Sequence, residues 1–124
     1  MFDGRDLEAA ERMVDDWQAG IEARAARARE LSARLSRLSG RARSDDRLIT
    51  VTVGASGDLV GLELDERIRQ RPAAETARAI LATLRAAQTR LTEAVAAATA
   101  ETVGADSATG RAVLASYTGR LGGA

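Results

Sequence analysis

Residues 3–38, DGRDLEAAERMVDDWQAGIEARAARARELSARLSRL, carry the clearest structural pattern in the sequence. Apolar side chains recur in it at alternating intervals of three and four for about five heptads, which is typical of a helix that packs along another helix. Such a helix extends about 50 Å, which is longer than a compact domain of this size is wide. The stretch therefore predicts a helical arm over residues 4–38 that a partner helix must cover. The two rows of its apolar seam are Leu7, Val14, Ile21, Ala28 and Leu35, and Ala10, Trp17, Arg24, Leu31 and Leu38.

The composition limits how large a core the chain can build. The chain has 124 residues, the length of one domain, and its aromatic side chains are Phe2, Trp17 and Tyr117. Ala and Leu supply most of the apolar content, which favours helix over sheet. A thin core and an uncovered seam together favour a homodimer. Trp17 is interpreted as an anchor between two arms, with stacking on a base as the alternative.

Absent residue types exclude several kinds of chemistry. The sequence has no Cys and no His, which removes disulfides, thiolate metal sites, Cys nucleophiles, the commonest general base and the commonest neutral metal ligand. Adjacent carboxylates such as Asp15 and Asp16 point in different directions on a helix. Ser56, within the glycine turn 54–57, has the wrong spacing for a nucleophile elbow. The sequence therefore predicts no enzymatic activity, no metal site and no cofactor.

The N-terminal sequence and the hydrophobicity of the chain bear on its location, and the type of basic residue bears on phosphate contact. The first residues contain no apolar segment of a signal peptide, and no stretch approaches the roughly 20 apolar residues that cross a bilayer. We therefore expect a cytoplasmic protein without membrane contact. Every basic residue is Arg, which indicates a GC-rich genome. Arg also suits bidentate phosphate contacts better than Lys does.

The net charge is zero, but the charges are unevenly distributed. Residues 1–22 sum to −5 and residues 23–47 sum to +5, so the arm is acidic at its start and basic toward its end. Arg27, Arg34 and Arg41 would share one heptad flank of a continuous helix. Interhelical salt bridges or solvation explain such a row, and the functional alternative is a stripe that faces phosphates. Together with two arginines farther along, the candidate phosphate contacts are Arg24, Arg27, Arg29, Arg34, Arg37, Arg41, Arg43, Arg78 and Arg85.

A β-hairpin follows the arm. Residues 47–53 are rich in β-branched side chains and predict a strand with Ile49, Val51 and Val53 on one face. Residues 54–57 form a glycine turn, and residues 58–65 predict the returning strand, with Val60, Leu62 and Leu64 on its apolar face. A short first strand is expected at about residues 41–44. So small a sheet is marginal alone and needs helices or a partner's sheet against it.

A second long helix is expected over residues 72–103, opened by Pro72. Its apolar face is rich in Ala, so a partner can approach it closely. Residues 1–103 then form one dimerising domain, and residues 104–124 are expected to be a flexible Gly-rich tail with one helical turn near Val113-Leu114. The side chains expected in the core or the dimer contact are Val14, Trp17, Ile21, Leu31, Leu35, Ile49, Val51, Val53, Leu62, Leu64, Ile80 and Leu84.

This order of elements resembles the YbaB/EbfC family of bacterial nucleoid-associated proteins. The resemblance is centred on residues 48–88. It is carried by the strand Ile49–Val53, the turn Gly57-Asp58-Leu59, the return Leu62–Asp65, and a helix with Ala79-Ile80-Leu81 and Ala86-Ala87-Gln88. The chain would be a divergent member from a high-GC bacterium.

The resemblance implies an α+β fold: an α-β-β-β-α protomer with a long helix at each end and a small antiparallel sheet. It also implies a tweezer-like homodimer with coiled-coil arms that binds double-stranded DNA with little sequence preference and has no catalytic activity. The candidate arginines above come from charge and spacing and not from the family. The alternative function is a protein-interaction adaptor or secretion-linked partner whose arms grip another, unidentified protein.

Overall fold

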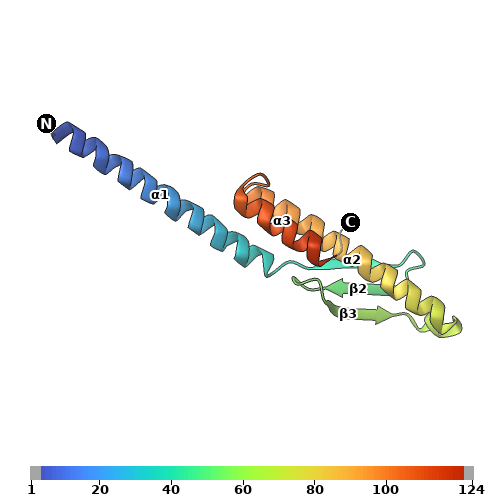
Figure 1. Cartoon of the computed structure of the whole chain (residues 1–124). Helices are drawn as coiled ribbons and strands as arrows, with labels where there is room; N and C mark the ends of the chain where they lie inside the picture. The colour runs from blue at the N-terminus through green and yellow to red at the C-terminus, as the bar shows by residue number, and fades with distance from the viewer. Residues whose placement is uncertain (1–3, 122–124) are drawn as a thin grey trace.

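The computed structural model describes residues 4–121 and has the predicted α-β-β-β-α order, extended by a further helix (Figure 1). The three strands form one antiparallel sheet in the order β1-β2-β3, which confirms the fold class. The elements are α1 (Gly4–Leu35), β1 (Gly40–Arg43), β2 (Ile49–Val53), β3 (Leu59–Leu64), the 3-10 helix η1 (Glu66–Gln70), α2 (Ala73–Thr102) and α3 (Ala108–Arg120).

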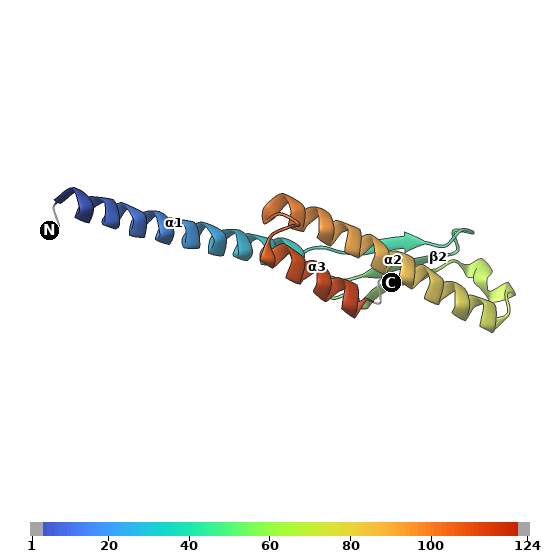
Figure 2. The same cartoon turned by 45° about the horizontal axis from the view of Figure 1, so that its top comes forward.

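Helix α1 is an arm that projects from the body of the chain (Figures 1 and 2). Its only buried residue is Leu31, near its C-terminal end, where it contacts α2. The helix ends at Leu35 and not at Leu38 as predicted, because the chain tightens there into i→i+3 turns: the Leu38 N–H donates to the Leu35 carbonyl. Within residues 4–121, the N-terminal part of the apolar seam, with Leu7, Val14, Trp17 and Ile21, is therefore left exposed.

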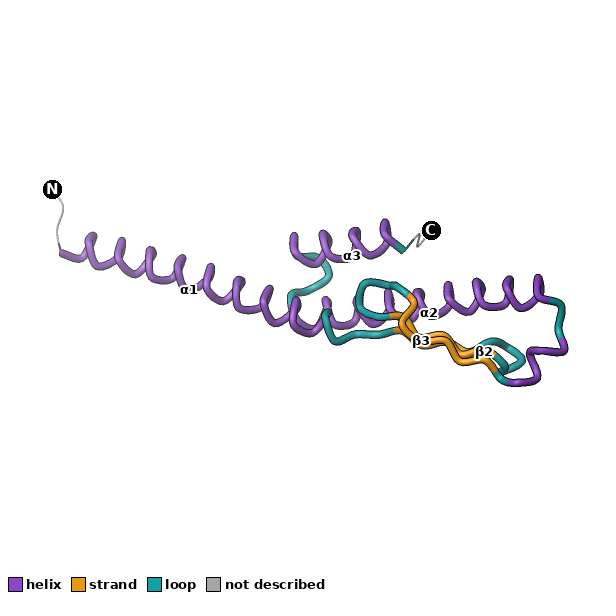
Figure 3. Tube along the Cα trace, turned by 90° about the horizontal axis from the view of Figure 1, so that it is seen from below, coloured by secondary structure: helices purple, strands orange, loops and turns teal. Residues whose placement is uncertain are grey.

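Helix α2 covers the sheet mainly over β1 and β2 (Figure 3). Ile49, Val51 and Val53 are fully buried beneath it. The edge strand β3 is different: Leu62 and Leu64 pair with Val51 and Ile49 on the same face but remain 42% and 45% exposed. The apolar face of the sheet thus continues beyond the helix that covers it.

The register of β3 differs from the predicted alternation. An irregularity between Thr52 and Val53 pairs Val53 with Leu59. Val60, expected on the apolar face with Leu62 and Leu64, has no partner in this register and is largely exposed. An extra residue of this kind is a β-bulge, which simple alternation cannot anticipate.

Gly40 allows α2 to pack directly on β1. A Cβ at this position would lie 2.9 Å from the Leu91 backbone nitrogen and would overlap the Ala87 carbonyl oxygen. The sequence suggests only a helix-ending role for this glycine. Its structural role is the close approach between strand and helix backbones.

The predicted flexible tail is wrong where the structure describes it, because residues 108–120 form α3, which runs back beside α2 (Figures 1 and 2). The Ser107 side chain caps its start by accepting from the Gly110 N–H. The Tyr117 hydroxyl donates to the Ala55 carbonyl at 2.9 Å. Leu121 fills the space beside Gly57, whose φ of 85° suits glycine. Residues 122–124 of the predicted tail lie outside the described residues.

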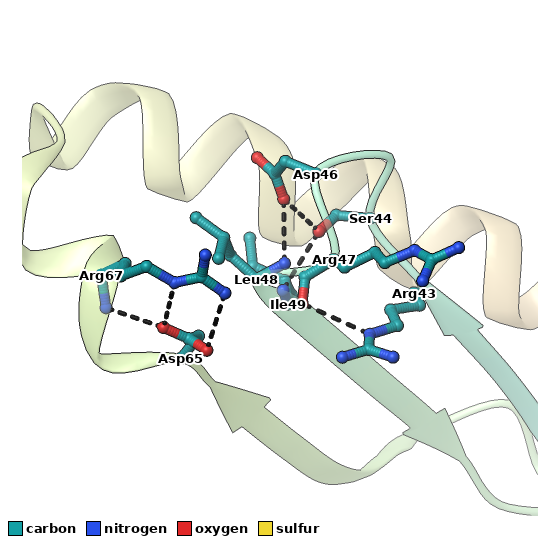
Figure 4. Close-up of polar contacts among 8 residues, drawn as sticks. All are labelled: Arg43, Ser44, Asp46, Arg47, Leu48, Ile49, Asp65 and Arg67. Carbon is teal, nitrogen blue, oxygen red and sulfur yellow. Dashed lines mark hydrogen bonds and ion pairs between the residues drawn. The ribbon is translucent and has the colours of Figure 1, made fainter.

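The turn between β1 and β2 is fixed by Asp46 (Figure 4). Its carboxylate accepts from the Leu48 N–H at 3.0 Å and the Ser44 hydroxyl at 2.7 Å, and it pairs with Arg71. These contacts, led by the Leu48 N–H, lower the pKa of Asp46 to about 2. The turn thereby ties the hairpin to the connector that leads into α2.

We expect Gly40→Ala to destabilise the protein by about 1–3 kcal/mol, because the methyl group must push α2 away from β1. Urea unfolding followed by circular dichroism measures this change. Gly119→Ala is the matched control, since a Cβ added to this residue of α3 would meet nothing within 4 Å; it should be neutral or slightly stabilising. Equal stability of the two variants would contradict the close-packing role of Gly40.

We expect the stability difference between the wild type and Asp46→Asn to depend on pH. The lowered pKa of Asp46 means that its ionised form stabilises the folded state above about pH 4 and that this contribution is lost as the pH falls toward 2. Urea midpoints should therefore favour the wild type near neutral pH and converge near about pH 2. Asp45→Asn, one residue away, is the control. A constant difference across the range would refute the role assigned to Asp46.

Candidate nucleic-acid interface

Several of the arginines in and just beyond the C-terminal half of α1 either line a small cavity or lie on the exposed surface. Arg24 and Arg27 line a cavity of about 150 Å³ together with Val103 and the start of α3. Arg29 is exposed, as is Arg37 just beyond the helix. These four cations remain candidates for phosphate contact.

Arg34 has a structural partner. Its guanidinium donates to the Glu101 carboxylate at 2.8 Å and to the Thr102 hydroxyl at 2.9 Å. This contact holds the arm against the end of α2. It is an interhelical salt bridge, one of the explanations that the arginine row allowed. The single-flank interpretation is wrong for Arg41, because α1 ends at Leu35 and Arg41 lies in β1.

Three arginines of the connector into α2 are also paired. Arg67 and Arg69 lie 3.0 Å from Asp65 and Glu66, and Arg71 pairs with Asp46. The side-chain hydrogen bond from Arg67 lowers the pKa of Asp65, and the same contact raises the pKa of Arg67. These cations are therefore poorer candidates for phosphate contact than the unpaired ones.

Other arginines gather at the free edge of the sheet. Arg41 and Arg43 lie on β1, and together with Ala42, Thr50 and Arg90 of α2 they line an open cavity of about 430 Å³. The Arg43 Nε donates to the Arg47 carbonyl at 3.3 Å, which orients its side chain (Figure 4). Arg78 and Arg85, the other two candidates, are exposed on α2 and do not line this cavity.

Sequence reasoning did not single out Arg90. It lies outside the heptad row of Arg78 and Arg85, and nothing local distinguishes it. The packing of Ala87 and Leu91 against Gly40 brings Arg90 to the edge of β1. Only the long-range contact between strand and helix could have identified it.

The side chains expected in the core or the dimer contact divide into two groups. Leu31, Ile49, Val51 and Val53 are buried within the chain, and Leu35, Ile80 and Leu84 pack partly buried against the core. The second group is exposed, with Trp17 at 66%. Its members are Val14, Trp17, Ile21, Leu62 and Leu64.

The described part of the chain was compared with two other kinds of feature, a metal site and a membrane span. No group of three or more acidic side chains in residues 4–121 is placed to hold a metal ion. None of the described helices is long and apolar enough to cross a membrane.

Comparison with known proteins assigns the chain to a family. None of the curated proteins compared with the chain matches it. The profile of the YbaB/EbfC DNA-binding family matches residues 10–106, a region that runs from α1 through α2 and stops before α3. This match covers most of the sequence and agrees with the order of helices and strands. The chain therefore belongs to the YbaB/EbfC DNA-binding family, whose members are nucleoid-associated proteins.

Proposed function

We propose that the protein acts as a homodimer that binds duplex DNA in the bacterial nucleoid, without catalysis and with little sequence preference. The observation that carries this proposal is that α1 combines an exposed apolar seam with a basic C-terminal part, where the segment 23–47 of charge +5 begins. Burial of the exposed seam favours dimerisation, and the positive charge favours contact with DNA phosphates. Family membership supports DNA as the ligand.

The dimer is supported by the apolar surface that the protomer leaves exposed. Val14, Trp17 and Ile21 recur at heptad spacing along the arm, and all three are exposed. Full burial of such a side chain contributes about 1.5–3 kcal/mol. Leu62 and Leu64 on β3 offer a second apolar patch. A second copy of the chain would cover both surfaces with surfaces of the same kind.

DNA contact is supported by the arginines that lack an acidic partner. Phosphate contacts from guanidinium groups give affinity without reading base sequence, which agrees with a surface that has few aromatic or amide side chains. Arg27, Arg29 and Arg37 are exposed, and no described ion pair includes them. A dimer would present two copies of this basic segment.

An adaptor function is the second candidate. The acidic segment 1–22 and the zero net charge favour a protein partner that the arms would grip. Pull-down with and without nuclease separates the two functions, because partners held through DNA are lost on nuclease treatment.

We expect Trp17→Ala/Ile21→Ala to weaken the dimer at least tenfold, because truncating buried apolar side chains typically costs about 2–5 kcal/mol each. Sedimentation equilibrium measures the dissociation constant, and circular dichroism checks that the helices persist. Met13→Ala removes an exposed side chain outside the seam and should leave the dimer intact. A wild-type monomer at micromolar concentration would rule out the proposed assembly.

We expect wild-type binding to an arbitrary labelled duplex to weaken linearly with salt on a log–log plot, with a slope of about −0.9 for each phosphate neutralised. Arg27→Gln/Arg29→Gln/Arg37→Gln should reduce the slope by about 2.7 for each protomer in contact. Fluorescence anisotropy across a salt series measures both slopes. Arg67→Gln/Arg69→Gln/Arg111→Gln removes the same charge from the connector and α3. If both triple variants behaved alike, the basic segment of the arm would not be the contact surface.

A further inference from the structure

The open edge of β1 carries a cavity lined by positive charge alone. Its charged lining residues are Arg41 and Arg43 on β1 and Arg90 on α2, and no carboxylate lines it. Its volume is about 430 Å³, and Ala42 and Thr50 complete its lining. Three guanidinium groups around one cavity repel one another unless an anion lies between them.

The arginines of this cavity keep most of their donors unused. Within residues 4–121, Arg41 and Arg90 form no ion pair and no side-chain hydrogen bond. Arg43 uses only its Nε, toward the Arg47 carbonyl. Asp65, whose pKa the charge of Arg43 helps to lower, is already paired with Arg67. The cavity therefore combines high positive charge with free N–H groups.

The backbone of β1 adds donors at the same edge. The Ser44 N–H donates to the Ile49 carbonyl at 2.9 Å, so the ladder bonds of β1 fall at alternate residues from Ser44 to Ala42. The N–H groups of Arg41 and Arg43 consequently face away from β2, toward the open edge. Backbone N–H groups are regular phosphate ligands in protein–DNA complexes.

We propose that this cavity is a phosphate-binding site that holds the backbone of duplex DNA and that Arg90 is one of its contacts. The inference rests on the proposed DNA-binding function and locates a second contact surface, away from the arm. The site lies on the rigid α2–β1 unit, where Gly40 fixes Arg90 beside Arg41. A site on packed secondary-structure elements can fix the orientation of the duplex relative to the sheet. The arm α1 then contributes further positive charge to the DNA contact.

The cavity is open to solvent along a strand edge, which suits a polymer that passes across it. Soluble polyphosphates share the same chemistry and are the competing source of ligand. The test therefore compares duplex DNA with tripolyphosphate at equal ionic strength.

Anisotropy of a labelled duplex is measured from about 50 to 300 mM salt. Arg90→Gln should reduce the log–log slope by about 0.9 per protomer in contact, and Arg41→Gln/Arg90→Gln by about 1.8. Arg90→Lys keeps the charge and should keep the slope. Arg111→Gln, an exposed cation on α3, is the control for net charge and should also leave the slope unchanged.

The possible outcomes separate a failure of the proposed phosphate site from a failure of the proposed DNA-binding function. If the wild type binds and the Arg90 and Arg41 variants match Arg111→Gln, the site is refuted while DNA binding stands. If the wild type does not bind duplex at low salt, both proposals fall. Saturable micromolar binding of tripolyphosphate that is lost in Arg90→Gln, while the duplex slope of that variant stays at the wild-type value, would assign the cavity to a small polyphosphate and overturn its role in DNA contact.

Discussion

The close backbone contact between α2 and β1 at Gly40 sets the position of the helix on the sheet. Because Gly40 has no side chain, the helix at Ala87 and Leu91 lies directly on the strand. That spacing lets Ile49, Val51 and Val53 of the neighbouring strand be fully buried. It also brings Arg90 beside Arg41 at the sheet edge. One close approach therefore determines both the core and the position of a cluster of positive charge.

The protomer buries only part of the apolar surface that its sequence provides. Helix α2 covers β1 and β2, whereas β3 and most of α1 keep exposed leucine, valine and tryptophan side chains. Exposed apolar surface arranged at heptad spacing is typical of half of an assembly. The proposed dimer follows from this incomplete burial, and the basic end of α1 places charge beside the contact.

Hydrophobic periodicity and β-branched runs, which can be recognised within a short stretch of sequence, correctly predicted a strand and a long helix. The β-branched run Ile49–Val53 and the long helix α2 appear where expected. Helix α3 was missed because its stability comes from long-range contacts, including Tyr117 with Ala55, which no periodicity reveals. For the same reason charge counting ranked Arg34 among the phosphate contacts, although Glu101 pairs with it, and overlooked Arg90. Residue spacing describes the faces of a single helix or strand. The contacts that a side chain makes with other elements depend on how those elements pack together.

The proposed function requires that two protomers bind duplex DNA together through phosphate contacts. Sedimentation equilibrium of the protein with a short labelled duplex, at low and at high salt, measures the mass of the complex directly. We expect a complex with two protomers on each duplex at low salt, which dissociates as salt is added while the protein dimer persists. A complex with a single protomer, or free duplex at low salt, would contradict it.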